Sequence, residues 1–256
     1  MEKKIISIVN QKGGVGKTTT TINLGTALAA IDKKILLIDL DPQGNLSTGI
    51  GISKSQRNES IYNVIANNSS IKSTIKETKI PNLKIVPSNL NLSGIEFELA
   101  TDNDRAKKLI NKFNALEDEY DFIFIDCPPS LGILTVNSLA ASGSVLVPLQ
   151  CEFYALEGLA QLLKTIEKVR ENMNPTLHLE GIILTMFDSR NRLSEDVVND
   201  AREHLGEKVF NTIIPRNVRL SEAPSHALPA IIYDQTCAGS LAYINLAKEL
   251  INRLKI

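Results

Sequence analysis

The chain has 256 residues, 43% of them hydrophobic, which is enough for the core of one large α/β domain or two small ones. Its 28 basic and 29 acidic residues nearly balance, so any nucleic-acid site must be a local patch. No apolar run approaches the roughly 20 residues of a membrane span, and the start leads directly into a strand pattern, unlike a signal peptide. Three cysteines without metal-ligand spacing favour a reduced cytoplasmic protein with buried thiols.

Short apolar runs alternate along the chain with amphipathic stretches. The runs predict buried strands at residues 4–9, 34–39, 83–86, 121–125, 144–149, 181–186 and 211–214, with a short one at 230–232. Apolar stripes at helical spacing predict helices at 103–117, 156–170, 194–205 and in the tail from Ala238 to Ile256. We therefore expect one domain, residues 1–256, built as a doubly wound, mostly parallel α/β sheet with helices on both faces.

The stretch from residue 52 to residue 81 is the least regular part of the chain. It is rich in Ser, Asn and Lys. Its pattern predicts a short helix near residues 61–65 between surface loops. Such a stretch is either a solvated insertion or a surface that binds a partner, and the sequence leaves both interpretations open.

The most informative segment is residues 11–19, Gln-Lys-Gly-Gly-Val-Gly-Lys-Thr-Thr, which joins the first predicted strand to a helix. It fits the phosphate-binding pattern G-x-x-x-x-G-K-[ST] except that Gln11 replaces the first glycine. Backbone N–H groups of residues 13–18 can wrap a β-phosphate at the positive end of the helix. Lys17 would bind the β- and γ-phosphates, and the Thr18 hydroxyl would ligate Mg²⁺.

Three carboxylates follow predicted strand ends, where a doubly wound sheet gathers its ligands. Asp126 ends an apolar strand, and a carboxylate there resembles the Walker B acid, which holds Mg²⁺ directly or through water; the alternative is a helix or turn cap. Asp39 and Asp41 are two residues apart and point the same way if their strand continues through both. One of them could instead be a turn residue before the Pro-Gln-Gly sequence that follows.

Four segments form a recognisable set in a fixed order and spacing. They are Lys-Gly-Gly-Val-Gly-Lys-Thr-Thr-Thr from Lys12, Asp39-Leu40-Asp41-Pro42-Gln43-Gly44-Asn45, Ile125-Asp126-Cys127-Pro128-Pro129-Ser130, and Ile214-Pro215-Arg216-Asn217-Val218-Arg219-Leu220-Ser221-Glu222-Ala223-Pro224-Ser225. Together they resemble the ParA/MinD group of dimeric P-loop ATPases, which has a deviant Walker A loop, and within it the short Soj type of partition ATPase. The resemblance implies a deviant P-loop at 10–19, switch I at 39–46, switch II at 126–132 and an adenine- and DNA-side loop at 215–225.

The resemblance also implies what the site binds. The protein would use ATP and Mg²⁺ and hydrolyse ATP weakly, with stimulation by a partner and by DNA. Asp41 would orient the attacking water, while Asp39 would lie near the metal, through water. Pro215 would pack on the adenine and Asn217 or nearby backbone would contact its edge, although this segment could be an ordinary β–α loop. The implied nucleotide contacts are Gly13, Gly14, Val15, Gly16, Lys17, Thr18, Thr19, Pro215 and Asn217, and the implied metal contacts are Thr18, Asp126 and Asp39.

Lys12 corresponds to the signature lysine of this group. By resemblance it would reach across a twofold interface to the nucleotide of a second copy, much as an arginine finger does. Each site would then be complete only in an ATP-dependent homodimer, with Lys12, Lys17 and Asp41 as the catalytic residues. The alternative is a solvated loop lysine.

Arg190 and Arg219 match arginines implicated in DNA binding in this family. They imply that the ATP-bound dimer binds double-stranded DNA without sequence preference, which would associate it with the nucleoid. A ParB-type centromere-binding partner would stimulate hydrolysis and release. Both residues could instead be surface arginines paired with Asp188 or Glu222.

Two other functions remain open from the sequence. A MinD-like membrane-surface ATPase would need an amphipathic tail, and the stripe of Leu241, Ile244, Ala247, Ile251 and Leu254 has that spacing. The tail lacks Phe and Trp, however, so packing of a last helix on the sheet is favoured. An amidotransferase-like synthetase would need a substrate pocket with further chemical groups, of which the sequence gives no sign.

Overall fold

The described part of the computed structural model, residues 4–110, 112–116 and 119–255, contains a sheet of seven strands in the order β3-β4-β2-β5-β1-β6-β7. The strands from β4 to β7 pair in parallel, and β3 runs antiparallel to β4 at one edge. This is the doubly wound α/β architecture that the sequence predicts. The strands are β1 (Lys4–Ile8), β2 (Ile35–Asp39), β3 (Lys76–Glu77), β4 (Leu83–Val86), β5 (Phe122–Asp126), β6 (Ser144–Gln150) and β7 (His178–Thr185).

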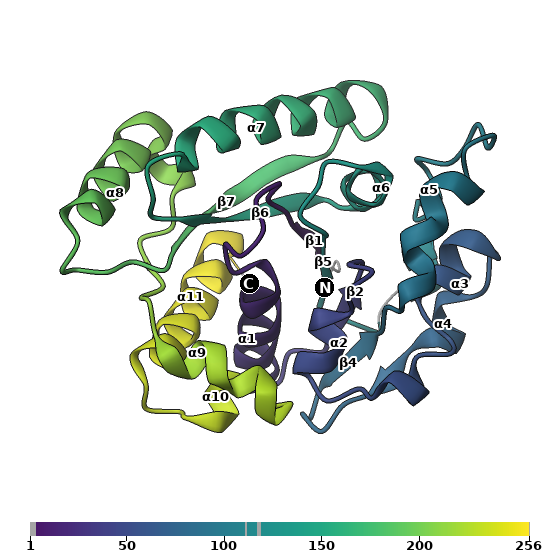
Figure 1. The fold of residues 1–256 in the computed structure, drawn as a ribbon, viewed down its shortest axis with the longest axis horizontal. Helices are drawn as coiled ribbons and strands as arrows, with labels where there is room; N and C mark the ends of the chain where they lie inside the picture. Colours follow the sequence, from purple (N-terminus) through teal and green to yellow (C-terminus); the bar gives the residue numbers. More distant parts are fainter. Residues whose placement is uncertain (1–3, 111, 117–118, 256) are drawn as a thin grey trace.

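Helices cover both faces of the sheet (Figure 1). Alternate residues of each central strand face opposite ways, so Leu36 and Ile38 of β2 join one apolar cluster while Ile35 and Leu37 join the other. Helices α6, α7 and α8 pack into the first cluster, and α1 and α11 pack into the second. The helices are α1 (Lys17–Ala29), α2 (Asn45–Gly49), α3 (Ile61–Ala66), α4 (Ile71–Thr74), α5 (Ile95–Glu98), α6 (Ile133–Ala141), α7 (Ala155–Asn172), α8 (Arg192–Leu205), α9 (Val218–Glu222), α10 (Ala230–Tyr233) and α11 (Ala238–Leu254).

The register of the central strands brings the predicted site residues together. Asp39 at the end of β2 lies beside Asp126 at the end of β5, and Ile8 at the end of β1 lies on the other side of Asp126. Because all three strands are parallel, their carboxyl ends meet at one edge of the sheet. The loop that follows β1 starts at this edge and leads into α1.

Two predicted strands are wrong. Residues 230–232 lie in α10, which follows Pro229. Residues 211–214 run beside β7 without forming a ladder; among the described residues, isolated bridges join Val209 to Ile182 of β7 and Pro215 to Phe187, just beyond that strand. The N–H groups of Asn211 and Thr212 donate to the Glu249 carboxylate instead, at 2.7 and 2.8 Å. The Glu249 side chain of α11 thus takes two N–H groups of the segment, while Phe210 N and Ile214 N still donate to carbonyl oxygens of β7.

The helix predicted at 103–117 is also wrong in the part that the structure describes; residues 111 and 117 lie outside that part. Its described residues form turns and a 3-10 helix at Lys112–Leu116. Asn137 of α6 bonds this backbone directly, accepting from Lys108 N at 2.7 Å and donating to Arg105 O at 2.7 Å. The amide side chain thus takes up backbone groups that a continuous helix would use.

The last helix, α11, packs beside α1 through a face that includes only part of the stripe that the sequence suggests: Ala247 is buried, and Ile251 and Leu254 pack against the same cluster. Leu241 is half exposed, whereas Tyr243, Leu246 and Leu250 are buried. Tyr243 fixes the rotation of the helix because its hydroxyl bonds Thr20 Oγ1 of α1 at 3.0 Å. Among the described helices, none combines the length and the apolar character needed to cross a bilayer. Ile256, where the predicted tail ends, lies outside the described residues.

Glu249 joins α11 to the segment beside β7, so its removal should destabilise the fold. Its burial raises the pKa of the carboxyl, but hydrogen bonds from Asn211, Thr212 and Arg253 outweigh burial and leave the pKa below its usual value. We expect Glu249→Gln to lower the free energy of unfolding by about 1–3 kcal/mol at pH 7. A carboxyl group whose pKa is lower in the folded than in the unfolded protein stabilises the folded state when the pH is above its unfolded pKa. The difference in stability between wild type and Glu249→Gln should therefore shrink as the pH falls below about 4.5.

Urea unfolding at pH 7 and pH 4 measures this effect, with the exposed Glu171→Gln on α7 as the control. Equal stability of Glu249→Gln and the control at pH 7 would contradict the prediction.

Candidate nucleotide site

The loop between β1 and α1 has a backbone suited to an anion. Gly14 and Gly16 adopt φ values of 76° and 92°, which residues with side chains rarely adopt. Thr185 Oγ1 at the end of β7 donates to Val15 O at 2.9 Å, and Asn10 Nδ2 donates to a β6 carbonyl at 2.8 Å. These bonds fix the loop from both sides. Its N–H groups at residues 13–18 are therefore preorganised at the start of α1, where a phosphate is favoured.

Lys17 opens α1 and is buried within this loop. Its Nζ donates to the carbonyl oxygen of Lys12 at 2.9 Å, so the ammonium lies across the loop that it belongs to. Burial lowers the pKa of Lys17, and the charges of Asp126 and Asp41 act in the opposite sense. A bound phosphate would add negative charge beside the buried Lys17 ammonium, which has little contact with water.

Thr18 and the two buried carboxylates form one cluster. Thr18 Oγ1 donates to Asp126 Oδ2 at 2.7 Å. Burial, together with the nearby charge of Asp39, raises the pKa of Asp126 to about 8. Burial also raises the pKa of Asp39 to about 6, although the hydrogen bonds from Ser47 lower it. Two buried carboxylates side by side, both with raised pKa values, create a site where a cation is favoured.

The donor set fits Mg²⁺, which prefers hydroxyl and carboxylate oxygens and keeps several waters. Thr18 and Asp126 already lie within hydrogen-bond distance of each other, as two ligands of one ion would. Asp39 differs, because Asp41 N donates to its Oδ1 at 3.2 Å and Ser47 N to its Oδ2 at 2.8 Å. With both oxygens engaged, Asp39 suits contact through water.

Asp41 shares a hollow with the loop. This hollow has a volume of about 420 Å³, and its lining includes Gly13, Lys17, Thr18, Asp41 and Pro129. Asp41 Oδ1 accepts from Gln43 N at 2.9 Å, which fixes the turn that leads into α2. Lys17, Thr18 and Asp41 therefore line one volume, and Asp126 is joined to it through its hydrogen bond with Thr18.

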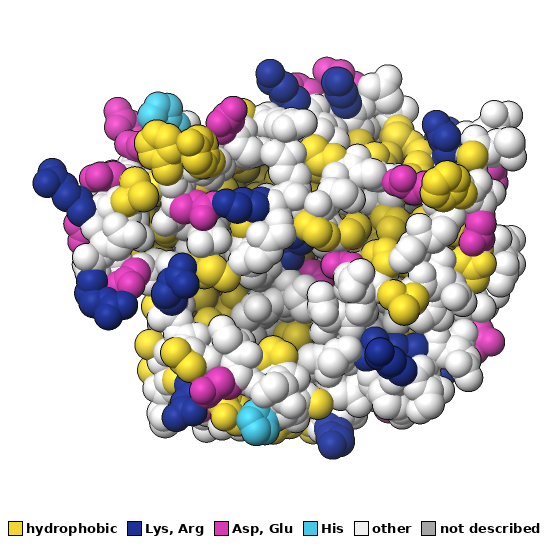
Figure 2. Space-filling view, in the orientation of Figure 1, with side chains coloured by type: hydrophobic (Ala, Val, Ile, Leu, Met, Phe, Trp, Pro, Cys, Tyr) yellow, Lys and Arg dark blue, Asp and Glu magenta, His cyan; other side chains and the backbone are white. Residues whose placement is uncertain are grey.

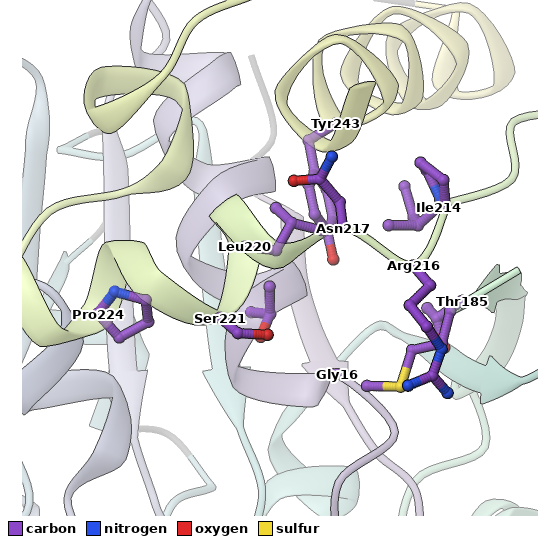
Figure 3. A pocket seen from close by; sticks show the side chains of 12 residues that line it. Gly16, Thr185, Ile214, Arg216, Asn217, Leu220, Ser221, Pro224 and Tyr243 are labelled. Atoms are coloured by element: carbon purple, nitrogen blue, oxygen red, sulfur yellow. The ribbon is translucent and has the colours of Figure 1, made fainter. Parts of the chain in front are cut away.

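A second hollow continues from the first and has the size of a nucleobase site. It measures about 330 Å³ and shares Gly16, Thr19, Met186 and Pro224 with the phosphate hollow. Figure 3 shows Asn217 and Tyr243 together on one side and Arg216 reaching toward Thr185 and Gly16. The predicted base-contact residues Pro215 and Asn217 both line it. Asn217 Oδ1 accepts from Arg219 N at 3.0 Å, so its amide nitrogen is the group that can face a base.

The sequence did not indicate several residues of this second hollow. Tyr243 reaches it from α11, and Met186 reaches it from the end of β7 with a positive φ of 53°. Thr185 also lines it while anchoring the phosphate loop. Met186 stands at the end of a predicted strand, where ligands gather, and that position was the available signal. Nothing in the local pattern around Tyr243 distinguishes it from a core residue.

Lys12 lies at the rim of the phosphate hollow. Its side chain is 49% exposed and forms an ion pair with Glu152, which follows β6. Next to Glu152, Phe153 and Tyr154 are 72% and 69% exposed. Lys12 is thus half exposed and ion-paired, whereas Lys17 is buried in the loop.

Arg190 and Arg219 both lie on the surface in ion pairs. Arg190 forms a two-point contact with Asp188, at 2.9 Å from Nε and 2.7 Å from Nη2. Arg219 contacts Glu222 at 2.8 Å and Asp234 at 3.4 Å. The pairs with Asp188 and Glu222 are those that the sequence analysis gave as the alternative to a DNA site. Figure 2 shows Lys and Arg side chains along the edge of the molecule that carries α8 and α9 in Figure 1.

Comparison with known proteins identifies the family. The AAA domain family matches residues 3–179. The chromosome partitioning protein ParA of Caulobacter vibrioides is 52% identical over 252 residues, which cover 98% of this chain and 94% of that protein. The chain belongs to the ParA/Soj family. The chromosome-partitioning ATPase Soj of Treponema pallidum is likewise 50% identical over 250 residues, 98% of each chain.

A solved structure of the same fold contains a nucleotide. Cobyrinic acid a,c-diamide synthase of Mycobacterium smegmatis, with an ATP analogue and magnesium bound, is 34% identical with a TM-score of 0.88, over 99% of this chain and 96% of that one. Family membership confirms the resemblance drawn from the four segments. The neighbour supports binding of nucleotide and Mg²⁺ by this ParA/Soj fold.

Proposed function

We propose that the protein is an ATP-dependent, dimerising switch that acts in DNA segregation. The observation that carries the proposal is the placement of two lysines on one loop: Lys17 lines the phosphate hollow, whereas Lys12 projects from its rim, half exposed. A lysine at the rim suits the nucleotide of a facing copy. Identity of 52% and 50% to two partition proteins favours this function over the synthase activity named for the structural neighbour at 34%.

Within one protomer, the N–H groups of residues 13–18 and Lys17 would bind the phosphates, and Pro215 and Asn217 would contact the base. Mg²⁺, held by Thr18 and Asp126, would neutralise negative charge on the phosphate oxygens. Asp41 lies across the same hollow and would orient the attacking water. It need not be a strong base, because phosphoryl transfer depends mainly on position and charge stabilisation.

In the proposed cycle, two ATP-bound copies associate so that Lys12 of each enters the site of the other. The dimer would align two arginine surfaces, each with Arg190 and Arg219, and bind nucleoid DNA without sequence preference. A ParB-type partner would then stimulate hydrolysis, and the ADP state would release DNA. The coupling is reciprocal: DNA favours the dimer by as much as dimerisation favours DNA.

DNA binding tests this proposal directly. We expect wild type to bind a random-sequence duplex only with ATP, and the double variant Arg190→Ala/Arg219→Ala to bind at least about 10-fold more weakly at 0.1 M salt. The slope of log affinity against log salt should also decrease, by about 0.9 for each DNA phosphate that the variant no longer neutralises. ATP hydrolysis without DNA should be unchanged, because both side chains lie on the surface outside the phosphate hollow.

Arg170→Ala is the matched control, since Arg170 is another surface arginine in an ion pair, with Glu167 on α7. Equal DNA binding by wild type and the double variant would refute the assigned surface. Absence of DNA binding in any nucleotide state would refute the DNA switch, and pelleting with anionic liposomes and ATP would then test the MinD-like alternative. The structure gives that alternative little support, because the buried residues of α11 pack on α1.

A further inference from the structure

Arg57 is a buried cation that the proposed chemistry does not use. It follows the 3-10 turn Lys54–Gln56, whose residues are exposed, yet Arg57 itself is only 5% exposed. The composition of residues 52–81 predicts surface loops and gives no sign of an inward-directed guanidinium. A buried charge is costly unless it is hydrogen-bonded. The contacts of Arg57 therefore show what it holds in place.

The guanidinium bonds both ends of α2 and the chain that leaves it. Nη1 donates to Gly44 O at 3.2 Å, and Nη2 donates to Thr48 Oγ1 at 2.9 Å. Nε donates to Ile52 O at 3.1 Å. Gly44 is the N-cap of α2 and Thr48 lies in its last turn. One side chain thus fixes a five-residue helix that would be marginal on its own.

Gly44 leaves space for this guanidinium because it has no side chain. Its φ is 64°, in the left-handed region that favours glycine. A Cβ at Gly44 would lie 2.5 Å from Arg57 Nη1, too close for both groups to keep their places. The two residues, 13 positions apart in the chain, therefore form a matched pair.

The turn that Arg57 fixes carries Asp41, the residue assigned to orient the attacking water. Gly44 N donates to Asp41 O at 2.9 Å, so the residue whose carbonyl oxygen Arg57 bonds is itself bonded to the Asp41 main chain. On the inner side of α2, Ser47 Oγ donates to Asp39 Oδ2 at 2.6 Å. A shift of α2 would therefore move both carboxylates of switch I.

We propose that Arg57 is a positioning residue for hydrolysis, which holds α2 and the turn carrying Asp41 in the geometry that the reaction needs. This inference rests on the proposed ATPase function. Arg57 is not among the residues that line the phosphate hollow, so its loss should spare ATP affinity. A displacement of about 1 Å at a reacting centre costs on the order of 100-fold in rate, so kcat should fall.

Two variants separate geometry from charge. Arg57→Lys keeps the positive charge but lacks the planar fork that reaches three oxygens at once, and Arg57→Met keeps only the length. We expect kcat to fall by about 10-fold in Arg57→Lys and by about 100-fold in Arg57→Met, with the Kd for ATP within about twofold of wild type. Gly44→Ala should lower kcat similarly, and its combination with Arg57→Lys should cost less than the product of the single effects. Arg105→Ala is the control, because Arg105 is exposed and makes one long bond to Ala100 O at 3.4 Å.

Hydrogen exchange without nucleotide supplies a readout that does not depend on hydrolysis. In Arg57→Lys, amides of residues 44–49 should exchange faster while those of α7 keep their wild-type rates. If wild type hydrolysed no ATP, the proposed function would fail, and exchange would still decide whether Arg57 holds switch I. Wild-type kcat in Arg57→Met, wild-type exchange at residues 44–49 in Arg57→Lys, or parallel losses of kcat, ATP affinity and melting temperature in Arg57→Lys would each overturn the inference.

Discussion

Lys17→Ala is expected to abolish ATP binding, because Lys17 is the cation at the centre of the phosphate hollow. In the free protein its Nζ bonds the Lys12 carbonyl oxygen, and a phosphate would take over that donor. Hydrogen bonds to charged groups are worth about 1.5–3 kcal/mol each, and Lys17 would contact two phosphates. We therefore expect ATP affinity to fall at least about 100-fold, since about 1.4 kcal/mol corresponds to a factor of 10.

Isothermal titration with ATP and Mg²⁺ measures the loss. Lys164→Ala on α7 is the matched control, because Lys164 is an exposed lysine outside both hollows. The melting temperature of Lys17→Ala should be checked in parallel, since the Lys12 carbonyl loses its partner. ATP affinity within threefold of wild type in a folded Lys17→Ala protein would show that the loop does not bind nucleotide as assigned.

The sequence predicts the sheet well because its central strands are buried on both faces. Each residue of β2 and β5 is buried, so their apolar runs are continuous and unmistakable. Parallel strands then place Asp39 and Asp126 side by side without any knowledge of side-chain contacts. The phosphate loop and its carboxylates could be predicted because each motif consists of residues that are adjacent in the sequence.

The features that the sequence did not predict depend on contacts between distant residues. The segment at 211–214 is strand-like in composition. Two of its N–H groups nevertheless donate to the carboxylate of Glu249 on α11, which is 38 and 37 residues away from them in the chain. The rotation of α11 depends on the Tyr243–Thr20 bond, across 223 residues. Arg57 has the surroundings of a surface residue in the sequence and is buried only because Gly44 leaves room for it. Periodicity contains no information on such pairings.

Asp41→Ala is expected to produce an ATP-bound dimer that persists, because this change should affect hydrolysis and leave binding intact. Asp41 lines the phosphate hollow, but the residues assigned to hold phosphate and metal are others, namely Lys17, Thr18 and Asp126. Loss of the group that orients the water should lower kcat by about 100-fold or more. A dimer that ATP closes and hydrolysis opens would then accumulate with ATP, but not with ADP.

Asp41→Asn distinguishes the proposed role from a purely structural one. Asp41 Oδ1 accepts from Gln43 N, and an amide oxygen can still accept that bond while the negative charge is lost. If Asp41 orients water as a carboxylate, Asp41→Asn should hydrolyse ATP as slowly as Asp41→Ala, and sedimentation with ATP should show dimers in both. If Asp41→Asn turned over ATP at the wild-type rate while Asp41→Ala did not, the residue would support the turn into α2, and the attacking water would have to be oriented by another group. The exposed Asp196→Ala on α8 is the control, with wild-type turnover and a transient dimer expected.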